Sequence, residues 1–314
     1  MGAPRIGVFG GINMDLVIQS EKLPRPGETI KGTSFTQAPG GKGANQAVAA
    51  AKMGGEVVMF GHVGDDSFGS ELLTGMDNAG VDCSFVGRVR GKPTGLAFIV
   101  VDRRGENAIT FVGGANDEYP SGYIAGLRET ISACDVVLVQ LECRMEAVSE
   151  FLELANEEKV PIILNPAPAV PLRPELIARC KVIAPNETEA EALTGIRAVD
   201  PDSAARAARV LAKEGCPDVI ITMGAAGAFV LSAAEGNKGI VPAPTVSSVD
   251  TVAAGDVFLG AFAVRYASGD SLMDATIFAN YAAALSTTRP GAQPSIPALE
   301  EVKSFKASHQ EALG

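Results

Sequence analysis

Short apolar runs rich in β-branched residues alternate along this chain with longer segments whose apolar residues recur at helical spacing. The runs cover residues 5–9, 57–62, 136–140, 161–164, 181–184 and 218–222, and the helical patterns cover 66–79, 121–133, 145–158 and 202–214. Parallel strands need crossover helices, and these helices cover both faces of the sheet. The alternation therefore predicts an α/β fold with a doubly wound, mostly parallel sheet and helices on both faces.

Two stretches, at about residues 15–37 and 94–112, break the alternation. The first reads as extended segments, and the second as a hairpin of residues 95–101 and 107–112. We expect them to form a small β-sheet, inserted as a lid into a single domain that spans residues 1–314. An additional sheet with one apolar face needs a cover, and a second copy of the chain would provide it, so a homodimer is expected.

Composition excludes several classes of protein. The 26 basic and 37 acidic residues leave a net charge of −11, which argues against nucleic-acid and anionic membrane surfaces as partners. No apolar run approaches the roughly 18 residues of a membrane span. Five scattered cysteines and the absence of a signal peptide pattern favour a cytoplasmic protein with reduced thiols. With His62 and His309 as the sole histidines, neither a histidine-rich zinc site nor a His-dependent triad is expected.

The heptapeptide Asp250-Thr251-Val252-Ala253-Ala254-Gly255-Asp256 precedes an apolar helical run at residues 257–266 and follows a β-rich stretch at 239–249. Small residues at a helix start let backbone amides approach an anion closely. A carboxylate directly after them suits a base that takes a proton from a hydroxyl attacking a phosphoryl group. An ordinary N-terminal cap, with Asp256 complementing the helix dipole, explains the heptapeptide equally well.

A second glycine-rich segment, residues 38–47, is not a Walker A loop, because Lys42 is followed by Gly43 and Thr36 stands where the first glycine belongs. Residues 10–15 do not read as G-x-G-x-x-G either, so a Rossmann dehydrogenase is not supported. The polar side chains here suit a small polyol; they are Asn13, Asp15, Lys42 and Asn45. Taken singly, Asn13 and Asp15 are explained as well by an Asx turn.

Three further segments are compatible with a nucleotide or an ion. Residues 186–191 form an acidic helix start, and residues 222–227 form a glycine turn between strands. Both are also common structural features. Residues 286–295 form an irregular loop after a helix, rich in carbonyls and hydroxyls. That loop suits a hard monovalent cation or no ligand at all.

The segments 40–46 and 250–256 together resemble the two signatures of the ribokinase-like (PfkB) sugar kinases, and the resemblance extends from Gly10 through Pro297. It implies ATP-dependent phosphorylation of D-ribose at its 5-hydroxyl, with Mg²⁺ on the nucleotide and an activating K⁺. Asp256 would be the general base, and the amides around Ala253, Ala254 and Gly255 would form an anion hole.

The resemblance also implies a set of binding residues. The sugar-binding set is Asn13, Met14, Asp15, Gly41, Lys42, Gly43, Ala44, Asn45, Glu142 and Asp256. The ATP-binding set is Asn186, Thr222, Met223, Gly224, Ala225, Ala226, Gly227, Gly255, Asp256 and Asn280. The K⁺ set is Asp250, Val252, Ser286, Arg289, Gly291 and Ser295, several through backbone carbonyls.

Met14 departs from the family pattern, which commonly has a small residue between the two sugar ligands. A flexible apolar side chain there could reshape the pocket, which makes 2-deoxyribose the competing pentose. A second hypothesis is another kinase of the same family, acting on deoxyribose, a ketose or a nucleoside. The absence of tryptophan and the presence of four tyrosines count against a nucleoside. A non-catalytic sensor on the same fold is the remaining alternative, and the presence of Asp256 argues against it.

Overall fold

The structure is a computed structural model that describes residues 2–233, 235–236 and 238–311. Its main sheet has the strand order β14-β13-β12-β11-β10-β9-β1-β4-β5 in the described part of the chain, with β6 paired to β4. Neighbours from β12 through β5 are parallel, whereas β13 and β14 are antiparallel. The predicted mostly parallel sheet is confirmed.

The main-sheet strands are β1 (Arg5–Phe9), β4 (Glu56–Gly64), β5 (Val81–Asp82), β6 (Val86–Val89), β9 (Val136–Val139), β10 (Ile162–Leu164), β11 (Val182–Ile183), β12 (Asp218–Thr222), β13 (Ala228–Ser232) and β14 (Lys238–Val241). The α-helices are α1 (Lys42–Lys52), α2 (Ser67–Asn78), α3 (Arg128–Ser132), α4 (Met145–Glu157), α5 (Pro174–Ile177), α6 (Glu187–Thr194), α7 (Pro201–Lys213), α8 (Ala254–Ala267), α9 (Leu272–Ser286) and α10 (Leu299–Glu311). Short 3₁₀ turns are η1 (Gly114–Asp117), η2 (Ala125–Leu127), η3 (Gly224–Ala226) and η4 (Gln293–Ser295).

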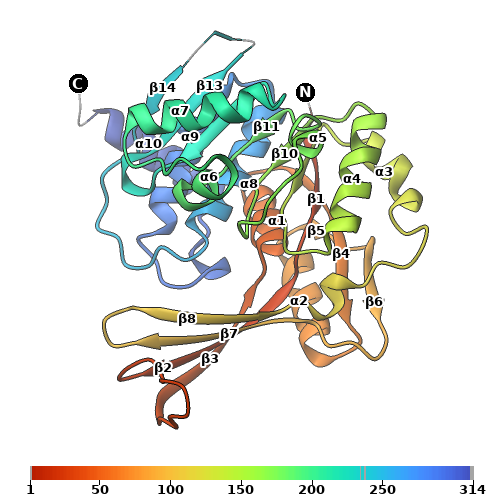
Figure 1. Cartoon of the computed structure of the whole chain (residues 1–314), viewed down its shortest axis with the longest axis vertical. Helices are drawn as coiled ribbons and strands as arrows, with labels where there is room; N and C mark the ends of the chain where they lie inside the picture. The colour runs from red at the N-terminus through yellow and green to blue at the C-terminus, as the bar shows by residue number, and fades with distance from the viewer. Residues whose placement is uncertain (1, 234, 237, 312–314) are drawn as a thin grey trace.

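Helices cover both faces of the sheet, as Figure 1 shows. Val136 and Leu138 of β9 join one apolar cluster with α1, α8 and α9, while Val137 and Val139 join the other with α4 and α7. This alternation arises because successive side chains of a strand point to opposite faces. No helix in the described residues is both long and apolar enough to cross a membrane.

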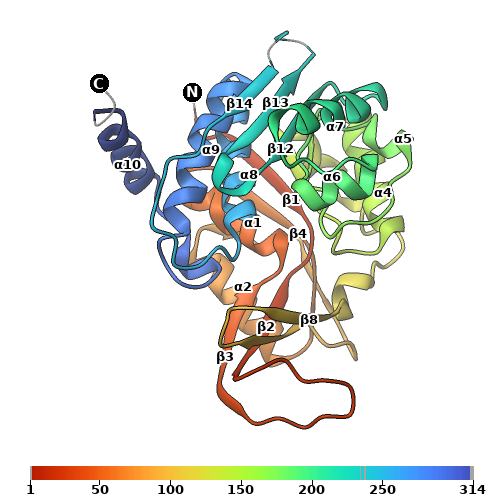
Figure 2. The same cartoon turned by 60° about the vertical axis from the view of Figure 1, so that its left-hand side comes forward.

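A separate four-stranded sheet has the order β3-β2-β7-β8. Its strands are β2 (Asn13–Ser20), β3 (Gly32–Gly40), β7 (Gly95–Asp102) and β8 (Asn107–Val112). It projects from one end of the molecule, below the main sheet in both views (Figures 1 and 2). Its strands match the two stretches that interrupt the strand–helix alternation.

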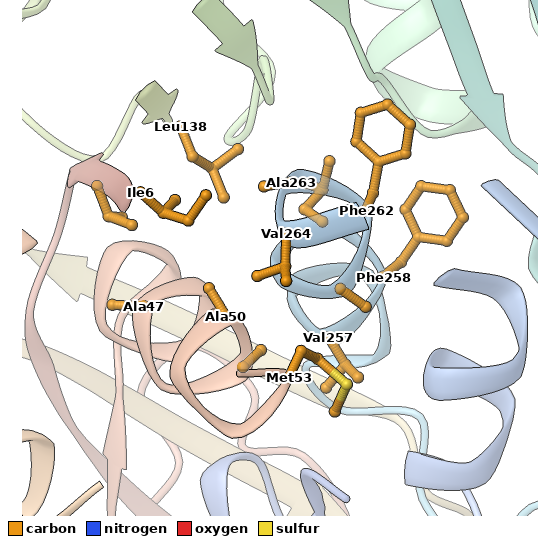
Figure 3. Close-up of a cluster of buried hydrophobic side chains, with 14 of the residues drawn as sticks. Ile6, Ala47, Ala50, Met53, Leu138, Val257, Phe258, Phe262, Ala263 and Val264 are labelled. Atoms are coloured by element: carbon orange, nitrogen blue, oxygen red, sulfur yellow. The ribbon is translucent and has the colours of Figure 1, made fainter. Parts of the chain in front are cut away.

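Helices α1 and α8 pack closely against each other on one face of the sheet. Figure 3 shows Ala50 and Met53 of α1 facing Val257 and Val264 of α8. A Cβ added at Gly260 of α8 would lie 2.5 Å from the Ala49 Cβ and 2.8 Å from the Gln46 carbonyl oxygen. Gly260 therefore permits the close approach, one helical turn after Asp256.

Two expected elements are shorter than their patterns predict. In the stretch 121–133, the helix α3 begins at Arg128, and turns and η2 occupy the preceding residues. In the stretch 239–249, the strand β14 ends at Val241. The remainder has no strand pairing, because the chain leaves the sheet edge to reach the start of α8.

Candidate active site

A cavity of about 190 Å³ opens where loops follow the carboxyl ends of the central strands. Asn165, Ala184 and Thr222 lie at or directly after the ends of β10, β11 and β12. The start of α8 forms the opposite wall. The complete lining is Lys42, Asn165, Ala167, Ala184, Asn186, Glu189, Thr222, Thr251, Ala253, Ala254, Gly255, Asp256 and Leu259. The cavity therefore joins predicted sugar-binding and ATP-binding residues.

The Asp256 carboxylate lies in the first turn of α8 and is 6% exposed. Both of its oxygens accept hydrogen bonds from amide side chains of α1. The Asn45 Nδ2 donates to Oδ2 at 3.0 Å, and the Gln46 Nε2 donates to Oδ1 at 2.9 Å. These bonds hold the carboxylate in one orientation at the cavity wall.

The backbone before Asp256 forms a cradle of amide groups. Ala253 has a left-handed conformation with φ of 59°, which is uncommon for a residue other than glycine. A left-handed residue next to helical ones aims successive N–H groups into one concavity, which is an anion-binding arrangement. Among the described residues, the N–H groups of Gly255 and Asp256 have no hydrogen-bond acceptor, whereas the Ala254 N–H donates to the Thr251 carbonyl at 3.2 Å. The Ala253 N–H likewise has no acceptor among the described residues, so the free amides of this segment are those of Ala253, Gly255 and Asp256.

The predicted sugar-binding residues meet near the short connection between β1 and β2. The Glu142 Oε2 accepts hydrogen bonds from the Lys42 backbone N–H at 2.8 Å and from the Asn13 Nδ2 at 3.3 Å. Asn116 donates to the Asn13 Oδ1 at 2.7 Å and accepts from the Ile12 N–H at 3.0 Å. Asn116 is fully buried, so it fixes the orientation of the Asn13 amide.

Burial dominates the acidity of this region. It raises the pKa of Asp15 to about 6, with the Asp256 charge adding to the effect and Lys42 opposing it. Burial also raises the pKa of Glu142 to about 7 against the opposing charge of Lys42. The Asp256 carboxylate in turn raises the pKa of Lys42 above its usual value. The site thus holds the charged ammonium of Lys42 beside two carboxyl groups, Asp15 and Glu142, whose pKa values are raised.

The segment 41–44 positions α1 against the loop after β1. Gly41 has φ of 86°, and a Cβ there would lie 2.6 Å from the Gly11 carbonyl oxygen, so a side chain is excluded. Gly43 and Ala44 are buried within the first turn of α1. Met14 is placed differently: its side chain is fully buried in the apolar cluster, on the opposite strand face from Asn13 and Asp15. The structure does not bring it together with the other sugar-side side chains.

On the nucleotide side, Asn186 caps α6 and forms a capping box with Glu189. The Glu189 N–H donates to the Asn186 Oδ1 at 2.8 Å, and the Asn186 N–H donates to the Glu189 Oε2 at 2.9 Å. Both side chains also line the cavity, and burial raises the pKa of Glu189. The two interpretations of this acidic helix start, cap and ligand site, are therefore compatible.

The predicted turn at 222–227 begins at the cavity. Thr222 lines the cavity and forms a parallel β-bridge with Asn186. The following turn η3 is exposed to solvent and does not line the cavity. Met223 and Gly227 close the turn through a 2.8 Å backbone hydrogen bond. Asn280 of α9 does not line the cavity. Its Nδ2 donates to the carbonyls of Val241 and Pro242, which lie beside Gly227.

The predicted K⁺ residues fall on two loops that contact each other. The Asp250 Oδ2 accepts from the Gly291 N–H at 2.8 Å, and the Asp250 N–H donates to the Thr287 carbonyl at 3.1 Å. Ser286, the last residue of α9, and Ser295 of η4 are buried, whereas the Val252 side chain is exposed. The Arg289 guanidinium pairs with Glu301 of α10 at 2.6 Å, which leaves its backbone carbonyl as the oxygen available to a cation. No cluster of three acidic, histidine or cysteine residues suited to a metal occurs in the described ranges.

The sequence does not single out three residues that the structure places at the site, namely Gln46, Asn116 and Glu189. Gln46 lies inside a glycine-rich signature, and Glu189 occupies the third position of an ordinary acidic cap. Asn116 comes from a turn 103 residues beyond Asn13 along the chain. Only Glu189 carries a local signal, because a capping glutamate directly after a strand end also faces the ligand edge of the sheet.

Known proteins resemble the chain over nearly its whole length. A family model described as pfkB family carbohydrate kinase matches residues 3–299. The ribokinase of Schizosaccharomyces pombe is 41% identical over 307 residues, covering 95% of this chain and 96% of the relative. The deoxyribokinase of Salmonella typhi is 35% identical over 301 residues, covering 96% and 98%.

The fold has a close structural counterpart in Arabidopsis thaliana ribokinase complexed with ribose and ATP. The TM-score is 0.90 at 31% identity, over 97% of this chain and 99% of the other. The matching family model and the extent of these similarities show that the chain belongs to the pfkB family of carbohydrate kinases.

Proposed function

We propose that the protein transfers the γ-phosphoryl group of ATP to the 5-hydroxyl of D-ribose, giving ribose 5-phosphate and ADP. The observation that carries this proposal is the position of Asp256. A buried carboxylate lies beside a cradle of free backbone amides, in the cavity that joins the sugar side to the nucleotide side. The similarity to ribokinases over the whole chain supports the choice of substrate.

In the proposed reaction, Asp256 accepts the proton of the attacking hydroxyl while the oxygen of that hydroxyl forms a bond to the γ-phosphorus. The bond from phosphorus to the bridging oxygen breaks, and ADP leaves. The amides of Gly255 and Asp256 face the charge on the transferring group. Asn13, Glu142 and Lys42 hold the sugar hydroxyls, which places the reacting oxygen next to Asp256.

A magnesium ion would neutralise the nucleotide phosphates. The residues present fit this role. Glu189 and Asn186 line the cavity with oxygen atoms, and the scarcity of other acidic groups suits an ion that keeps waters and binds mainly to phosphates. We assign Glu189 to that ion, directly or through water.

We also assign K⁺ to the loops at 250–252 and 286–295. The Asp250 carboxylate, the Ser286 and Ser295 hydroxyls and nearby carbonyls supply hard oxygen ligands. The site lies directly before the amide cradle in sequence, so a cation there would set the geometry of the loop and not touch the sugar.

Ribose is favoured over 2-deoxyribose because Met14 does not face the sugar side. The Met14 side chain, which raised the 2-deoxyribose alternative, is fully buried in the apolar cluster, and this supports ribose. The similarity to a deoxyribokinase keeps 2-deoxyribose as the second candidate.

An ADP-release assay over ribose, 2-deoxyribose, fructose and adenosine tests the proposal. We expect the highest kcat/KM with ribose and phosphate at C5 in the product, identified by ³¹P NMR. A higher kcat/KM for another sugar would overturn the substrate. ATP binding without transfer to any substrate would instead favour a sensor.

We further propose a homodimer through the lid. Several large apolar side chains of its strands are exposed. The largest exposed fractions are 56% for Phe35 and 58% for Ile109. Apolar exposure of this kind on an isolated sheet indicates a surface that is covered in solution.

A further inference from the structure

Gln46 lies behind the proposed base, in a chain of buried amide side chains. Its Nε2 donates to the Asp256 Oδ1 at 2.9 Å and to the Asn165 Oδ1 at 3.1 Å. Its Oε1 accepts from the Gln140 Nε2. Gln46 and Gln140 are both 0% exposed, so their amide groups are shielded from bulk water.

The direction of this chain follows from the charge of Asp256. An ionised carboxylate only accepts hydrogen bonds, so the Gln46 Nε2 must face it. The Gln46 Oε1 then faces Gln140, whose Nε2 must turn toward it. That orientation leaves the Gln140 Oε1 buried without a partner among the described residues. An unsatisfied buried acceptor is costly, so the arrangement is maintained for the interaction at Asp256.

Gln46 itself is separated from the substrates. It is fully buried and does not belong to the cavity lining. Its neighbour Asn45 instead donates to the other carboxylate oxygen, Oδ2. The two oxygens of Asp256 are therefore held by two adjacent residues of one helix turn.

We propose that Gln46 is a positioning residue for the base: it anchors Oδ1 in the interior and leaves Oδ2, beside Asn45, to receive the sugar proton. The proposal rests on the proposed role of Asp256. Gln46 acts through Asp256 without touching substrate, so its loss lowers kcat and leaves the binding of sugar and nucleotide in place.

Three variants of the full chain test this, with Asp256→Asn as the reference for loss of the base. Gln46→Met keeps a similar volume and removes the donor, and we expect kcat to fall about 10- to 100-fold with both KM values within about threefold. Thr276→Val is the matched control, because Thr276 is equally buried, its hydroxyl donates to the Leu272 carbonyl within α9, and it does not line the cavity. We expect its kcat to change less than about threefold.

Gln46→Glu gives kcat a pH dependence that a purely structural role of Gln46 would not produce. Lys42, Asp15, Glu142 and Glu189 also surround Asp256 and are common to both Gln46 variants. A protonated carboxyl at position 46 can donate to Oδ1, whereas the methionine cannot. The ratio of kcat for Gln46→Glu to kcat for Gln46→Met should therefore rise as pH falls from 8 to 6.

ADP binding by calorimetry and the Tm of each variant establish that it is folded. Unchanged kcat in Gln46→Met, an equal loss in Thr276→Val, or a pH-independent ratio would each overturn the positioning role. Substantial activity in Asp256→Asn would instead overturn the base, which separates the two proposals. If Gln46→Met does not fold, the ratio of kcat for Gln46→Glu to kcat for wild type is measured instead. This ratio should rise as pH falls from 8 to 6, and a constant ratio would overturn the proposal.

Discussion

The Asp256 carboxylate carries the largest share of the proposed chemistry, and its surroundings explain how one residue can do so. Amide donors from α1 hold both oxygens, and free backbone amides of α8 lie directly beside it. The sequence predicts Asp256, Lys42 and Asn45 because their residue types and spacing are specific. It does not predict Gln46 or Asn116, because a buried amide acquires a role only from neighbours that are distant along the chain.

The raised pKa values of Asp15 and Glu142 predict a stability that depends on pH. Between about pH 4 and pH 7 the folded protein binds more protons at these groups than the unfolded chain does, so stability falls as pH rises. Glu142→Gln removes part of this penalty. The unliganded variant should gain a few degrees in Tm at pH 8 relative to wild type, and the gain should vanish near pH 4.5.

Thermal unfolding at the two pH values, with ribose titrated into each protein by calorimetry, checks this prediction. Ribose affinity should fall at least about tenfold in the variant, because a charge-assisted hydrogen bond is lost. A Tm difference that is the same at both pH values would refute the assigned ionisation.

At the scale of elements, the contact between α1 and α8 aligns the base with its partners. Gly260→Ala and Gly75→Ala are matched substitutions within helices. Gly75 of α2 is exposed with open space around it, so alanine there should stabilise by about 0.5–1 kcal/mol. At Gly260 the new methyl group meets the backbone of α1, so we expect a loss of about 1–3 kcal/mol and a lower kcat. Urea unfolding of both variants measures the difference, and equal stabilisation would contradict the close packing.

The loops at 250–252 and 286–295, to which we assign K⁺, predict that kcat depends on the monovalent cation. Replacing K⁺ with Na⁺ at constant ionic strength should lower kcat several-fold, because the smaller ion fits poorly between fixed carbonyls. Asp250→Ala removes the link to Gly291 and should make the rate insensitive to the cation. Steady-state rates of both proteins in each salt decide the point. Equal wild-type rates in K⁺ and Na⁺ would contradict the proposed activation by K⁺.

Strand and helix positions were the most predictable part of the fold. The patterns of β1, β12 and β8 give their bounds, because apolar alternation and turn residues act locally. The stretch 239–249 looks β-rich, yet only β14 forms there. Pairing requires a neighbouring strand, and beyond Val241 the chain passes toward α8, which no local pattern reveals.

At the scale of the whole molecule, the exposed apolar side chains of the lid sheet predict a homodimer. Light scattering should give twice the chain mass of 32.3 kDa at micromolar concentration. Ile18→Glu combined with Phe35→Ser should yield monomers, because charged and polar groups replace two exposed apolar side chains that lie opposite each other on one face of the lid. Val199→Glu, at a position 70% exposed outside the lid, is the control and should stay dimeric. A monomeric wild type would contradict the lid interface.

The central claim is tested most directly by the rate of phosphoryl transfer in Asp256→Asn. The substitution keeps the shape and removes the base, so kcat with ribose should fall at least about 10²-fold. ADP should bind with nearly unchanged affinity. A rapid-quench measurement of ribose 5-phosphate formation, at saturating ATP and ribose, provides the number. A rate near that of wild type would contradict the assignment of Asp256 as the base.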